Sequence, residues 1–188
     1  MFKYLFHSLI FIILTTPAIA QQVEVPMEIQ YNILLKVLSY DKNLSRFGTD
    51  EIRIGVFYQS GFKASAAAKD ELSESISKSK IKDIDKRKIS VFYSNLDYES
   101  PAAFIKEKKI SVIYFLPLRA VSIENILTDT KKIKILSCSA VKDYLSEGVA
   151  ISFALKSSKP EILVNLKAAK SEGTDFSSQL LKIVTVIE

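Results

Sequence analysis

A nearly continuous apolar segment near the middle of the chain reads Ile110-Ser111-Val112-Ile113-Tyr114-Phe115-Leu116 and stops at Pro117. Its β-branched and aromatic residues favour a strand, and proline ends it. Apolar residues follow one another here instead of alternating with polar ones, which is typical of a strand covered on both faces. The segment therefore predicts a central strand of a parallel sheet that lies between two helix layers.

Further strands and helices alternate around this segment. The other expected strands are residues 52–58, 89–93, 133–137, 149–155 and 161–165. Expected helices cover residues 26–39, 64–80, 100–105, 122–131 and a final helix from Asp175, with a single helical turn at 141–145. Alternation of this kind predicts an α/β fold: a single layered domain whose mostly parallel sheet has helices on both faces. The linker 156–160 is too short for a crossover helix, so the last two strands are predicted to form a C-terminal antiparallel hairpin.

The first twenty residues have the three parts of a secretory signal peptide. Lys3 supplies the positive charge, residues 5–14 the apolar run, and Ala18-Ile19-Ala20 the small residues before a cleavage site. An apolar run of about ten residues is too short to cross a bilayer, which needs about 20. We therefore expect residues 1–20 to be removed and residues 21–188 to act in the periplasm without inserting into the membrane.

The composition excludes several classes of enzyme. The only histidine is His7, inside the expected signal peptide, and the chain has no tryptophan. Without histidine, Ser-His-Asp or Cys-His catalysis and histidine-ligated metals are excluded from the mature protein. No stretch shows the spacing of a calcium loop or a phosphate-binding loop. We expect a non-enzymatic protein without cofactor or metal, with catalysis by carboxylates alone as the remaining enzymatic alternative.

Cysteine and charge restrict the remaining possibilities. Cys138 is the single cysteine, so no disulfide can form within the chain. It lies at the end of an apolar segment, where burial as a small apolar side chain is expected, with a reactive thiol as the alternative. The formal net charge is +5, and the basic residues of 78–88 are interrupted by Asp83 and Asp85. Such a run is typical of solvated surface, so no nucleic-acid partner is expected.

Ligands of open parallel sheets bind beyond the carboxyl ends of the strands. Neutral polar side chains and one arginine follow these ends and form the candidate ligand-binding set: Tyr58, Gln59, Ser60, Ser94, Arg119 and Ser137. The alternative is that they cap helices and close turns, as serine and asparagine commonly do in such loops.

The C-terminal part of the chain carries a family resemblance. Its segments are Gly148-Val149-Ala150-Ile151-Ser152-Phe153, then residues 161–170 (EILVNLKAAK), then residues 176–183 (FSSQLLKI). A glycine-led strand, a strand ending in Asn, an Ala-Ala helix start and a Ser-Ser-x-Leu-Leu helix resemble the YfiR family of small periplasmic proteins. The opening helix at residues 31–36 and the strand at 52–57 are also similar to that family.

The resemblance implies a periplasmic regulatory protein that binds the periplasmic sensor region of a membrane-bound diguanylate cyclase, holds it inactive and limits biofilm formation. The chain departs from the family in two ways. A lone Cys138 cannot form the internal disulfide that links some members to redox control, and Ser39-Tyr40-Asp41 replaces the usual Trp-Pro after the first helix. Two alternatives stay open: a small-ligand binding protein that uses the strand-end loops, and association as a homodimer.

Overall fold

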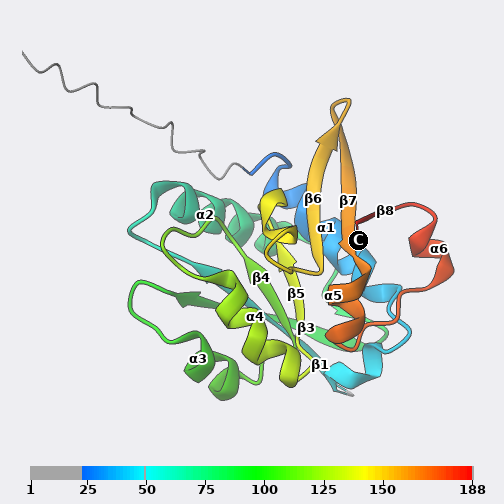
Figure 1. Cartoon of the computed structure of the whole chain (residues 1–188), viewed down its shortest axis with the longest axis horizontal. Coiled ribbons are helices and arrows are strands. Elements are labelled where there is room, and N and C mark those ends of the chain that lie inside the picture. Colours follow the sequence, from blue (N-terminus) through cyan, green and yellow to red (C-terminus); the bar gives the residue numbers. More distant parts are fainter. Residues whose placement is uncertain (1–22, 49, 188) are drawn as a thin grey trace, which may run out of the picture.

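The structure is a computed structural model that describes residues 23–48 and 50–187; the expected signal peptide, residues 1–20, lies outside them. One sheet of eight strands carries helices on both faces (Figure 1). The helices are α1 (Met27–Ser39), α2 (Lys63–Lys78), α3 (Pro101–Lys108), α4 (Ile123–Lys132), α5 (Leu166–Ser171) and α6 (Ser178–Leu181), with short 3-10 helices η1 (Leu44–Phe47) and η2 (Lys142–Leu145). The strands are β1 (Glu51–Tyr58), β2 (Asp83–Ile84), β3 (Arg87–Asn95), β4 (Val112–Phe115), β5 (Leu136–Ser139), β6 (Ile151–Lys156), β7 (Lys159–Asn165) and β8 (Thr185–Ile187).

The sheet is mostly parallel, as the sequence predicts. Its strand order is β2-β3-β1-β4-β5-β6-β7-β8. Strands β3, β1, β4, β5 and β6 run parallel to their neighbours in that series, and β8 runs parallel to β7. Among the described strands, only the β2–β3 and β6–β7 pairs are antiparallel. The predicted α/β class and the C-terminal hairpin are therefore confirmed.

Strand β4 shows why its sequence is apolar throughout. Val112 and Tyr114 belong to the core cluster that includes α1 and α2, whereas Ile113 and Phe115 belong to the cluster that includes α3 and α4. All four residues are buried. Because successive side chains of a strand point to opposite faces, a strand between two helix layers needs an apolar residue at every position.

Both hairpins turn through pairs of residues with positive φ. Asp85 and Lys86 join β2 to β3, and Ser157 and Ser158 join β6 to β7. Two consecutive positive φ values are the geometry of the two-residue turn that matches the twist of antiparallel strands. In Figure 1 the β6–β7 hairpin projects beyond the helices. Strand β2 has only two residues, and the sequence analysis does not predict it.

The prediction of a long final helix from Asp175 is wrong. Only one helical turn forms, α6, and the side chain of Ser177, not that of Asp175, caps its start. The chain then enters β8, where residues 185–187 pair with residues 163–165 of β7. All five residues of the segment 183–187 are β-branched, and such residues favour strands. Their spacing also fits one face of a helix, so the free edge of β7 decides between the two.

The predicted strand at residues 133–137 begins later, at Leu136. Ile133 ends α4, and Lys134 has a φ of +58°, so both belong to the turn before β5. Cys138, in β5, is buried as predicted, and burial raises the pKa of its thiol well above the ordinary value. In the part of the chain that the structure describes, no helix is both long and apolar enough to cross a membrane.

Candidate functional site

Three of the six candidate residues meet at the carboxyl ends of β1 and β4. The backbone N–H of Arg119 donates to the Gln59 side-chain oxygen at 2.6 Å. Gln59 and Ser60 donate from their side chains to the Asp97 carboxylate, each at 3.1 Å, and the Gly61 N–H donates to it at 2.7 Å. The Gly61 hydrogen bond, with those from Ser60 and Gln59, holds the pKa of Asp97 below its usual range. Much of the hydrogen-bonding capacity of this loop cluster is therefore satisfied within the protein.

The other strand-end candidates are used in different ways. Tyr58 is half-buried, and its ring centroid lies 6.0 Å from the ammonium nitrogen of Lys69. Ser94 is buried and donates to the Glu99 carboxylate at 2.6 Å. Asp97 is not among the residues predicted from the sequence, although an Asn-x-Asp sequence at the end of a strand is typical of a turn closed by its own side chains. In this turn, the side-chain oxygen of Asn95 accepts a hydrogen bond from the backbone N–H of Asp97 at 3.1 Å.

Ser137 lies inside β5 rather than in a loop, and it contacts a buried acid. Its N–H and hydroxyl donate to the two carboxylate oxygens of Glu172 at 2.8 and 2.7 Å. Its hydroxyl oxygen also accepts the Ala150 N–H at 2.9 Å. Glu172 has no exposed surface, and this burial raises its pKa to about 7, against the hydrogen bonds from Ser137 that favour the charged form.

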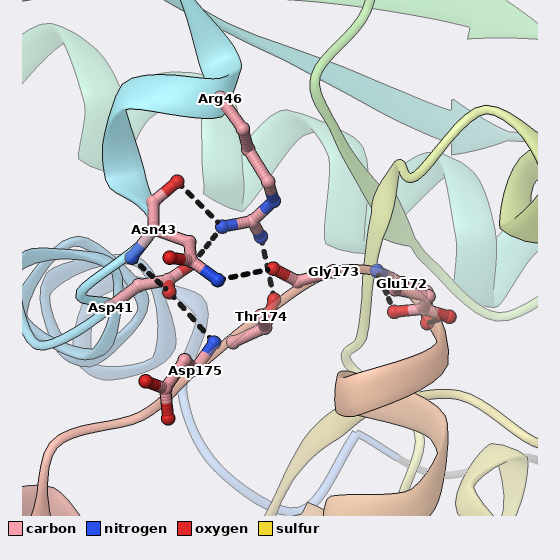
Figure 2. Close-up of polar contacts among 8 residues, drawn as sticks. Asp41, Asn43, Arg46, Glu172, Gly173, Thr174 and Asp175 are labelled. Carbon is pink, nitrogen blue, oxygen red and sulfur yellow. Dashed lines mark hydrogen bonds and ion pairs between the residues drawn. The ribbon is translucent and has the colours of Figure 1, made fainter.

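Beyond Glu172, the chain is tied to the end of α1 by the polar network of Figure 2. The buried carboxylate of Asp41 pairs with Arg46 and accepts the N–H groups of Asn43 and Asp175, both at 3.0 Å. Arg46 also donates to the Thr174 hydroxyl at 2.6 Å. These contacts join segments about 130 positions apart, so no local pattern in the sequence could have predicted them.

The chain ends in the C-terminal edge, defined here as residues 183–187, whose last three residues pair with β7. Ile183, Val186 and Ile187 are exposed at 61%, 38% and 36%. Among the described strands, β8 pairs only with β7, so its second edge is open. The opposite end of the sheet is the two-residue β2, whose neighbours are charged, and short charged strands are how proteins usually protect an edge. Strand β8 is also short, with three residues, but its side chains carry no charge.

Two findings apply to the described residues alone. Within residues 23–48 and 50–187, no group of three or more His, Cys, Asp or Glu side chains could hold a metal ion. In the same ranges, the carboxylates of Asp97, Glu172 and Asp41 each accept hydrogen bonds from donors of the protein itself.

Solved structures share this fold at low sequence identity. A conserved domain protein from Vibrio cholerae O1 biovar El Tor is 18% identical, with a TM-score of 0.62, over 87% of this chain and 60% of that one. An ABC domain in complex with L-Trp from Streptococcus pneumonia is 13% identical, with a TM-score of 0.59, over 86% and 60%. CD0873, a substrate binding protein with adhesive properties from Clostridium difficile, is 17% identical, with a TM-score of 0.53, over 77% and 57%. This chain thus spans about 60% of the length of those proteins.

No curated protein matches the chain. One family profile does, and it covers nearly all of the described residues. DUF4154, described as YfiR/HmsC-like, matches residues 28–185, from the first helix to the last strand. The matched region contains the glycine-led strand, the Asn-ended strand and the Ser-Ser-x-Leu-Leu segment that carry the resemblance described above, residues 148–153, 161–170 and 176–183. The chain therefore belongs to the YfiR/HmsC-like family.

Proposed function

We propose that this protein binds the periplasmic sensor region of a membrane-bound diguanylate cyclase and holds the cyclase inactive. Membership of the YfiR/HmsC-like family indicates a regulatory or binding role in the periplasm. The resemblance of residues 148–153, 161–170 and 176–183 to YfiR supports the narrower role. Inhibition of this kind needs a docking surface rather than a reaction centre.

The open C-terminal edge is the observation that carries the proposal. An edge strand presents unpaired N–H and C=O groups, which can pair with an extended segment of a partner. Exposed apolar side chains beside such an edge are typical of protein interfaces. Val186 and Ile187 lie in the edge strand β8, and Ile183, in the turn before it, adds a third exposed apolar side chain at this end of the sheet. The partner that fits is a protein with an extended, apolar segment in its periplasmic region.

The test is co-purification from membranes. The full chain, tagged and expressed in its native host, should retain a membrane protein with a periplasmic region and a cyclase domain, identified by mass spectrometry. Ile183→Lys with Val186→Lys should abolish the retention and raise cellular cyclic di-GMP. Ile81→Lys is the matched control, since Ile81 is 42% exposed and adjoins β2 at the opposite edge. Retention of the same cyclase by the double variant would contradict the proposed surface, and failure to retain any cyclase would contradict the function.

Binding of a small ligand is the second candidate function. It is supported by the fold likeness to proteins described as a substrate binding protein and as a complex with L-Trp. A ligand at one hundred times its dissociation constant stabilises a protein by about 2.7 kcal/mol. Thermal-shift measurements with a broad metabolite panel would show this as a higher melting temperature. Loss of that shift in Arg119→Ala would place the ligand at the strand-end loops, and no shift with any metabolite would count against this candidate.

A further inference from the structure

A cleft of about 530 Å³ lies at the opposite end of the sheet from the strand-end loops. It is formed by the segments that precede β4 and β5, the last turns of α3 and α4, and the end of η1 (Figure 1). Ser111 and Ile135, which directly precede the two strands, line its inner side. Its size falls within the roughly 300–1,000 Å³ of small-molecule sites.

The charge of the cleft is positive and largely uncompensated. Lys106, Lys109 and Lys134 line it, and all three are exposed. Among the described ion pairs, none involves these lysines; Lys134 donates to the Ser171 carbonyl oxygen at 2.8 Å. The acid in the lining, Asp129, is paired with Lys132 at 2.9 Å. Lining Arg46 is paired with Asp41, as described above.

Helix dipoles explain only part of this arrangement. Lysines in the last turn of a helix complement its dipole, which accounts for Lys106 at the end of α3. Lys109 and Lys134 follow the ends of α3 and α4 with φ values of +51° and +58°. Glycine or asparagine usually occupies such positions, because a left-handed conformation costs other residues about 1–2 kcal/mol. The chain therefore keeps a lysine on each side of the cleft at positions where glycine would be less strained.

The remaining lining of the cleft is mainly apolar. Its apolar members are Phe47, Ala102, Ile105, Ile110, Ile133 and Ile135. Ile133 is 61% exposed and adds apolar surface at the mouth of the cleft. A second cavity of about 190 Å³ shares Ala102, Ile105, Asp129 and Thr130 with the first and continues between α3 and α4 past Pro101 and Ile126. The apolar surface is thus elongated, with the cations at one end.

We propose that this cleft binds an amphipathic organic anion, a linear aliphatic carboxylate of the fatty-acid class. Lys109 and Lys134 hold the carboxylate, since an ammonium group pairs with it through charge-assisted hydrogen bonds. The hydrocarbon chain lies against Ile105 and Ile133 and extends into the second cavity, where it removes apolar surface from water. The proposal does not depend on the cyclase, because no residue that lines the cleft belongs to the C-terminal edge.

Binding is tested with the purified protein and octanoate as the probe, by isothermal titration calorimetry in low salt. Octanoate should bind saturably at one site, whereas 1-octanol lacks the charge and acetate lacks the chain, so each should bind at least tenfold more weakly. Raising the salt concentration should weaken octanoate binding, because the lysines are exposed to solvent. Octanoate that fails to bind, or that binds no better than either analogue, would overturn the proposal.

Two variants locate the site. Lys109→Glu with Lys134→Glu should weaken octanoate binding at least tenfold, and circular dichroism verifies that the variant is folded. Lys86→Glu is the matched control, because Lys86 is also exposed and has a φ of +66° but lies in the β2–β3 turn outside the cleft lining. Equal weakening by the control variant, or unchanged binding in the double variant, would refute the assignment. Neither result bears on the cyclase, which is absent from the experiment.

Discussion

Replacing Glu172 with glutamine should change how the stability of the protein depends on pH. The Glu172 carboxyl is buried, and burial raises its pKa from 4.5 to about 7 in the folded protein, despite hydrogen bonds from Ser137. In the unfolded chain the group is solvated and titrates near 4.5. The folded protein thus holds this proton more tightly than the unfolded chain, and the free energy of unfolding falls as the pH rises between these two values.

The size of the effect follows from the two pKa values. The difference between 4.5 and about 7 corresponds to about 3 kcal/mol, at about 1.4 kcal/mol per pKa unit. Below pH 4.5 the Glu172 carboxyl is protonated in both the folded and the unfolded state, so it costs no stability. Above pH 7 it is charged in both states, and the folded protein loses the whole of this free energy. His7 is the only histidine and belongs to the expected signal peptide, so no histidine of the mature chain titrates in this window.

Glutamine has almost the same shape as glutamate but does not titrate. Its amide oxygen can accept the Ser137 N–H that now donates to Glu172. We expect the difference in unfolding free energy between Glu172→Gln and the parent protein to shift by about 2.5 kcal/mol in favour of the variant between pH 5 and pH 8. A constant offset between the two proteins does not affect this comparison.

Urea unfolding at pH 5, 6, 7 and 8, followed by far-ultraviolet circular dichroism, measures the difference. Glu107→Gln is the control, because the Glu107 side chain is 67% exposed; this substitution should leave the pH dependence of the stability unchanged. Parallel stability curves for the parent and Glu172→Gln would show that Glu172 is charged throughout this range, and the reasoning from burial would be wrong.

Three further substitutions test the packing and the polar network by the same unfolding measurement. Tyr114→Phe removes a buried hydroxyl that donates to the Gln30 side-chain oxygen at 2.7 Å and should cost about 1–3 kcal/mol, so a loss below about 0.5 kcal/mol would contradict the bond. Asp41→Ala removes the carboxylate that pairs with the mostly buried guanidinium of Arg46, so the free energy of unfolding should fall by about 3–5 kcal/mol. Amide exchange in residues 173–177 should become faster, and unchanged exchange there would refute the role of the network. Gly55→Ala places a methyl group 3.0 Å from the side chains of Ile110 and Phe104, so the free energy of unfolding should fall by about 1–3 kcal/mol. An unchanged value would mean that these side chains move to make room for the methyl group.

Burial patterns are local, which is why the layered fold could be predicted. The apolar residues of 110–116 predict a strand covered on both faces. In the structure, the side chains on one face of β4 belong to one core cluster and those on the other face to the second cluster. The short linker 156–160 predicts the hairpin for an equally local reason, since it leaves no length for a crossover. The final segment 183–187 shows where this reasoning fails: its apolar residues fit a helix face or a strand, and pairing with β7 makes it a strand.

The strand-end candidates mark the same limit at the level of single side chains. Sequence reasoning could place Gln59, Ser60 and Arg119 at one edge of the sheet, because parallel strands bring their carboxyl ends together. It could not show that the Asp97 carboxylate would accept hydrogen bonds from the side chains of Gln59 and Ser60. Nor could it show that Ser137 would contact Glu172, which lies 35 positions further along the chain. Those contacts depend on how the loops pack.

By itself, the amino-acid sequence determined the α/β class, the hairpin, the burial of Cys138 and the resemblance to a periplasmic regulator. Each of these rests on residues that are neighbours along the chain or on composition. Only the tertiary structure decided that Glu172 loses its solvent, that the C-terminal edge stays open, and that Lys109 and Lys134 line one cleft. The physical reason is that solvation and charge environment are set by whatever groups surround a side chain in space, and here those groups come from distant parts of the chain.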